Sequence, residues 1–351
     1  MPAATRCLLC LVSRVKDDLD AGVRAGRITE GVRFDPLPDI ESEVWQNQLN
    51  NQKGLAKRHM DFGVLTLATR DDYQKAIGLA LSVRLSNPGV PIAVACPVLA
   101  RPLLAPYFDF VINDDPSIRG FEHKLHLDRY SPFDNTFFFD ADVLVFRNLV
   151  EVYHLWSEHP YTACGRVITG GISPFGLDRV RALSIIGREH FVSIDGAGHA
   201  FFRKPDCFPV FELARKFAVN YAEKFGVLGK LADEDVMGLA LSSLNLKTMP
   251  AIPFWSRYLS GKRGTVKMNA AESRCEMELV DTGEIQRPFM MHFAANEAPM
   301  PYARQLSLLF KRFGISTRGL MSMAIRDYFV TEVEWPIRQM IKRSLRRSKL
   351  L

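Results

Sequence analysis

The sequence predicts an α/β protein with a Rossmann-like sheet flanked by helices. Apolar, strand-like segments lie at residues 62–69, 91–95 and 108–112, and helical spacing from Asp71 onward separates the first two. Units of strand, helix and strand about thirty residues long are typical of right-handed parallel crossovers. A fourth apolar run follows at residues 136–145. We therefore expect these strands to share one sheet.

The remaining segments divide the chain into three parts. Residues 1–58 are polar and mixed and predict an N-terminal arm, residues 59–300 hold the sheet domain, and residues 301–351 predict a helical, basic C-terminal tail. Within the sheet domain, Asn-Pro-Gly at residues 87–89 ends the first helix. A further helix is expected over residues 234–244, after an acidic segment that suits a helix N-terminus.

The composition excludes wholesale disorder. Of 351 residues, 47% are hydrophobic, yet no apolar run approaches the ~18 residues that span a bilayer. The apolar start at residues 7–12 is too short for a secretory signal, and the six cysteines are scattered as reduced thiols would be, so the sequence predicts a cytoplasmic protein. The net charge of +6 includes six cations and no acid after Pro336. This asymmetry favours a phosphate-rich or membrane surface as the partner of the tail, and no nucleic acid is expected.

Two carboxylates interrupt the fourth apolar run. Asp140 and Asp142 flank the small residue Ala141 between apolar segments. Unpaired buried charge is costly, and alternate residues of an extended strand face the same way, so both carboxylates can face one divalent cation. The alternative is that the pair only ends a strand and caps the next turn, as aspartate readily does. Because the apolar flanks leave little room for a solvated turn, we favour a metal site.

Parallel sheets bind ligands at the carboxyl ends of their strands. Ala68, Thr69, Asp72 and Tyr73 follow the first strand and belong to the same rim as the two aspartates. Neither a glycine-rich dinucleotide fingerprint nor a P-loop follows this strand, so a diphosphate bound here requires a metal. A nucleotide bound after the first strand and a metal bound at the aspartates are the features expected of a transferase that uses a nucleoside-diphosphate sugar.

The sequence resembles glycosyltransferase family eight, the family of glycogenin and of bacterial lipooligosaccharide galactosyltransferases. The resemblance covers about residues 62–300, and its motifs are Leu67–Tyr73, Lys124 with Leu125 before Tyr130, Phe139–Val145, and Asn148 with Leu149. It implies the GT-A fold, a mixed Rossmann-like sheet flanked by helices. It also implies that Tyr73 stacks on uracil and that Lys124 contacts the donor. Packing of Tyr73 on the apolar side of its helix is the alternative.

Two later segments extend the resemblance. Residues 233–237 are similar to the family's Asp-Gln-Asp-Ile-Leu, which implies that Asp233 contacts the sugar and that Glu234 lies beneath the reacting carbon; an acidic first helical turn is the alternative. His292 matches a family histidine that binds the metal, although the glycine and lysine of that motif are Ala295 and Ala298 here. A packed core histidine is the alternative. Oxygen ligands with one imidazole favour Mn²⁺ or Mg²⁺ over Zn²⁺.

These features predict a metal-dependent glycosyltransferase that moves a hexose from a nucleoside-diphosphate sugar, expected to be a UDP-sugar, to a glycan or lipid-linked acceptor. The resemblance implies retention of the anomeric configuration. The departures at residues 295 and 298 leave open a non-catalytic scaffold that binds nucleotide sugar or metal. A haloacid-dehalogenase-type phosphatase also uses Asp-x-Asp, but normally after its first strand.

The C-terminal tail predicts peripheral binding to a membrane. Tyr328, Phe329 and Trp335 precede apolar residues at helical spacing, interleaved with the basic residues of 338–349. Such a basic amphipathic helix lies in the headgroup region of an anionic bilayer. A helix packed on its own domain with a solvated charged face is the alternative.

Overall fold

The computed structural model describes residues 61–69, 72–196, 198–227, 231–251, 253–294 and 298–329, together with residue 337. All of them belong to one unit of the chain, residues 42–351. The predicted N-terminal arm at residues 1–58 and the basic segment predicted to bind membranes lie outside the described residues.

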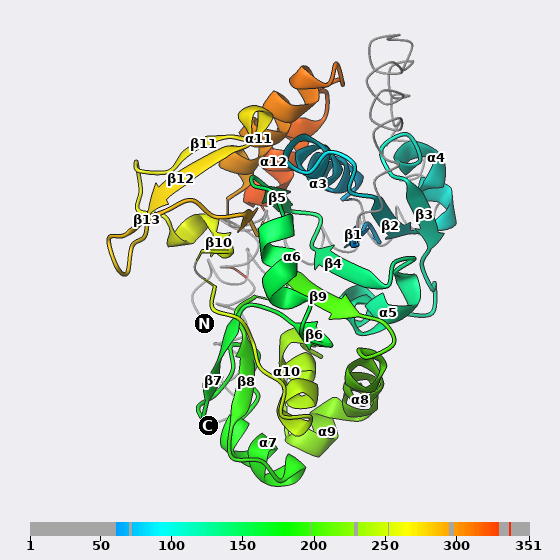
Figure 1. Cartoon of the computed structure of the whole chain (residues 1–351), viewed down its shortest axis with the longest axis vertical. Helices are drawn as coiled ribbons and strands as arrows, with labels where there is room; N and C mark the ends of the chain where they lie inside the picture. The colour runs from blue at the N-terminus through cyan, green and yellow to red at the C-terminus, as the bar shows by residue number, and fades with distance from the viewer. Residues whose placement is uncertain are drawn as a thin grey trace, which may run out of the picture. The chain divides into compact units, whose positions relative to one another are not determined.

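The main sheet has six strands, with bounds β1 Gly63–Leu67, β2 Ile92–Cys96, β3 Phe110–Asn113, β4 Asn135–Phe139, β6 Tyr161–Thr162 and β9 His199–Arg203. Their order is β3, β2, β1, β4, β9, β6 (Figure 1). The first four are parallel, whereas β9 runs antiparallel to β4, and β6 antiparallel to β9. The predicted α/β class and the parallel first half are confirmed, and the sheet as a whole is mixed.

The described helices surround this sheet. Those at least four residues long are α3 Tyr73–Ser86, α4 Arg101–Leu104, α5 Leu127–Tyr130, α6 Val150–Trp156, α7 Arg179–Ile186, α8 Phe208–Ala218, α9 Tyr221–Phe225, α10 Asp233–Ser243, α11 Pro299–Arg312, α12 Leu320–Phe329 and the 3-10 helix η2 Gly120–His126. Shorter 3-10 helices are η1 Val98–Ala100, η3 Tyr258–Ser260 and η4 Ala270–Glu272. Helix α3 ends where Asn-Pro-Gly predicted, because Gly89 has a φ of 89° that other residues rarely adopt.

The fourth apolar run is two strands and not one. Strand β4 ends at Phe139, the chain turns through residues 140–142, and β5 (Val143–Val145) leaves the main sheet. The Val143 N–H donates to the Asp140 carbonyl at 3.0 Å, which closes the turn. The expectation that alternation along one strand aims both carboxylates is therefore wrong. Two like charges one residue apart favour a turn at the carboxyl end of the strand, where solvent or a ligand reaches them.

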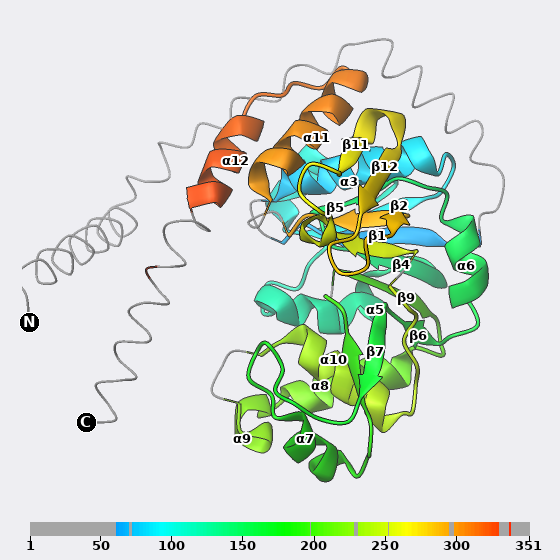
Figure 2. The ribbon, with the colours of Figure 1, turned by 90° about the vertical axis from the view of Figure 1, so that its left-hand side faces the viewer.

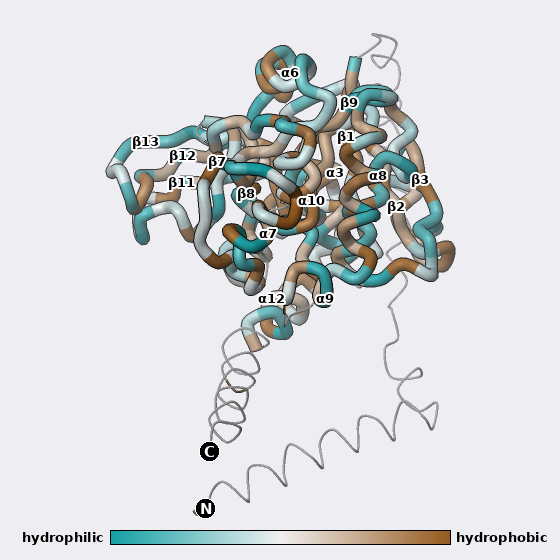
Figure 3. Tube along the Cα trace, turned by 90° about the horizontal axis from the view of Figure 1, so that it is seen from below, coloured by the Kyte–Doolittle hydropathy of each residue, from teal (hydrophilic) through white to brown (hydrophobic). Residues whose placement is uncertain are grey.

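Three smaller sheets complete the fold. Strand β5 pairs with β14 (Met290–His292), and β14 pairs with β10 (Trp255–Arg257). The second contains β11 Lys267–Asn269, β12 Arg274–Glu278 and β13 Ile285–Gln286. The third is the antiparallel pair of β7 Gly165–Ile168 and β8 Phe191–Ile194, with α7 between them in the sequence. Hydrophilic residues mark the outer end at β13 (Figure 3).

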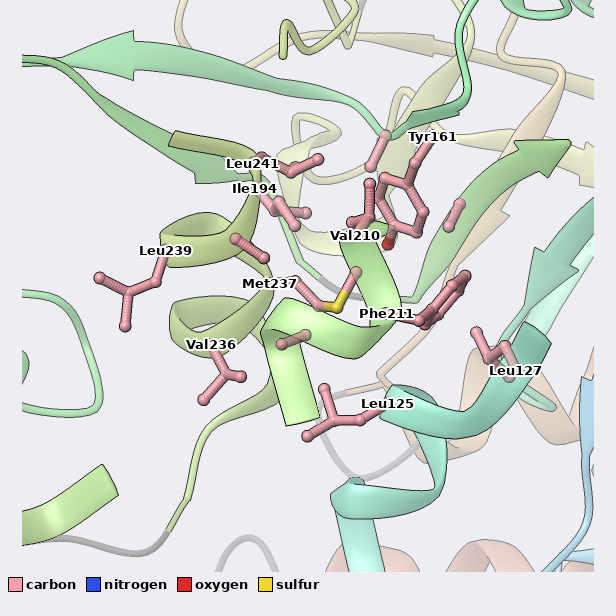
Figure 4. Packing of buried hydrophobic residues seen from close by; sticks show 14 of the residues in the cluster. Leu125, Leu127, Tyr161, Ile194, Val210, Phe211, Val236, Met237, Leu239 and Leu241 are labelled. Carbon is pink, nitrogen blue, oxygen red and sulfur yellow. The ribbon is translucent and has the colours of Figure 1, made fainter. Parts of the chain in front are cut away.

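One part of the core joins the main sheet to α8 and α10. Leu125 and Leu127 point toward Phe211 of α8 and Met237 of α10 (Figure 4), and all four side chains are buried. This packing fixes α10, and therefore Asp233 at its start, against η2. Because burial of each large apolar side chain contributes about 1.5–3 kcal/mol, the position of α10 is strongly determined.

Helices α11 and α12 lie beside α3 (Figure 2). The ammonium of Lys75 on α3 pairs with the Asp327 carboxylate on α12 at 3.1 Å. The Tyr302 hydroxyl on α11 donates to the carbonyl of Ala141 at 3.2 Å. Within the described part of the chain, every helix is too short or too polar to cross a bilayer.

Candidate active site at the end of strand β4

Two aspartates and one histidine meet at the carboxyl end of β4. Antiparallel pairing of β14 with β5 sets His292 opposite Val143, directly after the Asp140–Asp142 turn. The His292 Nε2 atom lies 3.1 Å from Asp142 Oδ1. One ligand atom from each of Asp140, Asp142 and His292 lies within 4.8 Å of the other two, and no other such group of His, Cys, Asp or Glu occurs among the described residues. This geometry can hold one metal ion.

Backbone and side-chain hydrogen bonds hold the aspartate turn in place. The Asp140 N–H donates to the Gly198 carbonyl at 2.9 Å, and the Phe293 N–H donates to the Asp142 carbonyl at 3.1 Å. Tyr302 adds the bond to Ala141 described above. The turn is thus tied to β9, β14 and α11, so its two carboxylates are preorganised. Sequence reasoning missed Tyr302, because no local pattern links α11 to a turn 160 residues earlier.

Lys124 bridges the aspartate turn and α10. Its Nζ lies 2.8 Å from Asp140 Oδ2 and 3.2 Å from Asp233 Oδ2. Burial acts to lower the pKa of Lys124, but the carboxylates of Asp140 and Asp233 outweigh it, and the pKa is raised. The ammonium therefore stays charged. The structure thus brings together Lys124, Asp140 and Asp233, which lie far apart in the sequence.

The charges of the site are strongly coupled. Burial raises the pKa of Asp140 despite the attraction of Lys124, and the carboxylate of Asp142 adds to this rise. For His292, burial acts to lower the pKa, but Asp142 outweighs it and the pKa is raised. Three carboxylates (Asp140, Asp142 and Asp233) and one ammonium leave a net charge of −2 when His292 is neutral.

A second histidine and a tryptophan support His292. His199 is buried, and its ring stacks on Trp255 with centroids 3.9 Å apart; Trp255 in turn lies 5.3 Å from the His292 ring. His199 Nε2 accepts the Cys164 N–H at 2.8 Å, and burial lowers its pKa to about 3, so it stays neutral. A Cβ at Gly198 would lie 3.0 Å from Trp255 and 3.2 Å from His292. A larger residue directly before β9 would therefore displace Trp255 or His292 slightly.

The nucleoside-binding residues predicted after β1 lie along the same rim. Ala68 is fully buried, and its N–H donates to the Ala95 carbonyl at 2.9 Å. Thr69, Asp72 and Tyr73 are half-buried. Burial raises the pKa of Tyr302, and the carboxylates of Asp142, Asp72 and Asp327 raise it further.

The two predicted catalytic carboxylates open helix α10. Asp233 is buried and ion-paired with Lys124, and Glu234 is half-buried. The next residue, Asp235, accepts hydrogen bonds from the Ser173 hydroxyl at 2.6 Å and the Tyr221 hydroxyl at 3.1 Å. These bonds fix the first turn of α10.

Solved structures with a similar fold are glycosyltransferases. The apo structure of the bifunctional glycosyltransferase WbbM aligns with a TM-score of 0.50 and 11% identity, over 76% of this chain and 52% of that one. The galactosyltransferase LgtC, in complex with donor and acceptor sugar analogues, aligns at 0.44 and 15% identity, over 72% of this chain and 95% of that one. Mouse xyloside xylosyltransferase 1, in its apo form, aligns with a TM-score of 0.40 and 12% identity, over 56% of this chain and 88% of that one.

No family model and no curated protein sequence matches the chain. The likeness to WbbM, of which this chain spans about half the length, is one of fold. The predicted GT-A fold is confirmed.

Proposed function

We propose that this chain is a metal-dependent glycosyltransferase that moves a hexose from a nucleoside-diphosphate sugar to an acceptor. The observation that carries the proposal is the meeting of Asp140, Asp142 and His292 at the end of β4, beside the pair of Lys124 and Asp233. The GT-A fold supports the reaction class. A UDP-sugar is the donor that we infer.

The donor atoms at this site suit Mn²⁺ or Mg²⁺. Two carboxylates and one imidazole match ions that prefer oxygen ligands, and the imidazole favours Mn²⁺. The net charge of −2 on the surrounding groups is balanced by one divalent ion. When bound, such an ion acts as a Lewis acid toward the departing diphosphate. Tyr302, Gly198 and the backbone of Phe293 hold the ligands in position for it.

The chain's own residues divide the remaining work. In our proposal Thr69, Asp72 and Tyr73 contact the nucleoside, with Ala68 shaping the rim beneath them. Lys124 contacts the donor and places Asp233 next to the sugar. The bond from the anomeric carbon to the phosphate oxygen breaks, the acceptor oxygen bonds to the same carbon, and the departing diphosphate takes up the proton of the acceptor hydroxyl. A carboxylate beneath that carbon, Glu234 or Asp233, stabilises the developing positive charge, which is consistent with retention.

Two alternatives make different predictions. A scaffold binds nucleotide sugar and metal without turnover. A haloacid-dehalogenase-type phosphatase needs its first aspartate after the first strand, whereas here Asp140 follows β4, the fourth strand along the chain. The position of Asp140 disfavours the phosphatase.

The test is a panel of nucleotide sugars with and without Mn²⁺. We expect one UDP-sugar to raise the melting temperature only with the metal, and to release UDP slowly even without an acceptor. Asp142→Asn should lose both responses, and the matched control Asp281→Asn, an exposed carboxylate in the loop before β13, should keep them. Binding without UDP release would identify a scaffold. No metal-dependent response to any nucleotide sugar would contradict the proposal.

We also propose an anionic membrane as the surface where the acceptor is met. Four large apolar side chains on α12, Met321, Ile325, Tyr328 and Phe329, are 50–63% exposed. Residues 298–329 carry five exposed cations (Arg304, Lys311, Arg312, Arg318 and Arg326), while their only acid, Asp327, is buried. Exposed apolar and basic groups without acids suit an anionic headgroup layer.

Vesicle sedimentation tests this surface. Intact protein should pellet at low salt with vesicles that contain phosphatidylglycerol and not with phosphatidylcholine alone. Deleting residues 336–351, or introducing Ile325→Ser with Phe329→Ser, should reduce pelleting, while Leu99→Ser, a substitution at a residue 92% exposed on η1, should not. Equal pelleting of all forms would exclude this surface as the anchor.

A further inference from the structure

A basic cavity lies at the far end of the strand pair that carries the metal ligands. Its volume is about 480 Å³, and its lining comes from β11, η4, β12 and the chain after β5 and before β14. Four cations line it, Arg147, Lys267, Arg274 and Arg287, against two carboxylates, Glu272 and Glu276. The volume falls within the range of about 300–1,000 Å³ that is usual for small-molecule sites.

The cavity is separate from the candidate active site. Along β5 and β14, Val143 is opposite His292 at one end, and Phe146 N–H bonds to Phe289 at the other. Arg287 precedes β14, and His292 is the last residue of that strand. None of the proposed metal or donor ligands lines the cavity.

One of its cations is held in place before any ligand binds. The guanidinium of Arg147 lies 3.7 Å from the centre of the Phe289 ring, and it donates to the Arg287 carbonyl at 3.3 Å. Stacking on an aromatic ring restricts the guanidinium, so little conformational entropy remains to be lost when it binds an anion.

The other cations can exchange their present carboxylate partners for an anionic ligand. Arg274 pairs with Glu272 at 3.2 Å and Arg287 pairs with Glu276 at 2.7 Å, but the two arginine side chains are 79% and 73% exposed. Pairs this exposed contribute at most about 1 kcal/mol, so a better anion can replace them. Lys267 lies opposite Glu276 in the β11–β12 pair and lowers the pKa of that carboxylate, but its ammonium makes no ion pair within 4.0 Å in the described part of the chain.

A buried hydroxyl in the lining has no hydrogen-bond partner among the described residues. Ser273 lies between η4 and β12 with a φ of 52°, in the left-handed region that serine rarely occupies. Its Oγ is buried and has no hydrogen-bond partner in the described structure. Buried polar atoms are almost always paired, so an unpaired hydroxyl in a polar cavity indicates a ligand or ordered water beside it.

We propose that this cavity binds the phosphate group of a phosphorylated ligand. Three arginine forks match the oxygens of a phosphate bidentately. Four cations line the cavity against two carboxylates, and an excess of one positive charge remains when Glu151, which pairs with Arg147 at 3.3 Å from outside the lining, is counted. The unpaired Ser273 hydroxyl lies in the same lining. The site goes beyond the proposed transfer reaction, and it needs neither the metal nor the donor.

The probes are inorganic phosphate, a hexose 6-phosphate, and vesicles that carry a phosphorylated inositol lipid. Titration calorimetry is run with a chelator present, so that phosphate cannot be held by a metal at Asp140 and Asp142. We expect saturable binding of inorganic phosphate and of the hexose phosphate, weakened about tenfold or more by Lys267→Gln with Arg274→Gln. The control Arg129→Gln with Lys216→Gln removes the same charge at exposed positions outside both the cavity and the proposed membrane surface, and it should bind like the intact protein.

The three probes distinguish a soluble phosphorylated ligand from a phosphorylated lipid headgroup. Hexose phosphate binding that the cavity variant loses, while it keeps vesicle binding through the α12 surface, identifies a soluble sugar phosphate. Vesicle binding that only the cavity variant loses identifies a lipid headgroup. The proposal is overturned if the intact protein shows no saturable phosphate binding, or if the cavity variant and the control variant lose it equally. Because metal and donor are absent, failure here is distinct from failure of the proposed function.

Discussion

Replacing Asp140 by asparagine separates the role of this residue in metal binding from its role in folding. Without metal, burial raises the pKa of Asp140 even though Lys124 lies 2.8 Å away. The buried surroundings therefore disfavour the ionised form of Asp140, and asparagine removes this negative charge. In the variant, the Lys124 ammonium still pairs with the Asp233 carboxylate, which lies 3.2 Å away, so Lys124 does not become an unpaired buried charge. We expect Asp140→Asn to change the free energy of unfolding of the metal-free protein by no more than about 1 kcal/mol.

The metal-bound protein should respond very differently. Loss of a group that only orients a ligand weakens metal binding about 10–100-fold, so loss of a ligand itself should reach at least the upper figure. At a metal concentration about 100 times the dissociation constant, binding adds about 2.7 kcal/mol of stability; a variant about 100-fold weaker retains about 0.4 kcal/mol. At about 2–4 °C per kcal/mol, the Mn²⁺-induced rise in melting temperature should fall from about 5–10 °C to about 1 °C.

Differential scanning fluorimetry with a Mn²⁺ titration, against a chelator baseline, measures both quantities. Asp281→Asn is the matched control, since it removes one exposed carboxylate remote from the turn. A full Mn²⁺ shift in Asp140→Asn would refute the metal assignment. A large loss of stability with chelator present would instead show that Asp140 holds the turn together.

Three further predictions address the other groups of the site. Because the pKa of His292 is raised, its pair with Asp142 stabilises the metal-free fold fully below about pH 6.5, and this stabilisation is lost as the pH rises through the raised pKa. The difference in melting temperature between the intact protein and His292→Ala, measured with chelator, should therefore shrink over that pH window. A difference that stays constant would exclude the pair. Mn²⁺ affinity should rise over the same window, because the metal binds neutral imidazole. Tyr73→Ala should raise KM for the donor more than it lowers kcat, and unchanged KM with reduced stability would make this residue packing only. Glu234→Gln should lower kcat with little change in KM, whereas full activity would limit Glu234 to positioning.

The sheet could be predicted because its pattern is local. The alternation of apolar strands with helical spacing predicted β1, α3, β2 and β3 within a few residues. The same reasoning wrongly ran one strand through residues 136–145. Local apolarity does not show where a strand leaves one sheet for another, since that depends on the later strand β14 that receives it.

The supporting residues of the site could not be predicted for a related reason. Tyr302, Trp255 and His199 act through contacts with segments far away in the sequence, and each is common as a core residue. His292 was proposed only through the family resemblance, because a lone histidine on a short apolar strand carries no signal of its own. The cavity cations likewise come from segments 120 residues apart, Arg147 and Lys267, and each alone is an ordinary surface charge.

The wide sequence separation of the metal ligands also sets the order in which the protein can become competent during synthesis. Asp142 and His292 are 150 residues apart, and Tyr302, which secures the turn, comes later still. At about 5–20 residues per second, a ribosome needs roughly 8–30 s to pass from the aspartates to the histidine. During that interval the nascent sheet carries the two carboxylates without their third partner, so tight metal capture waits until almost the whole domain has emerged.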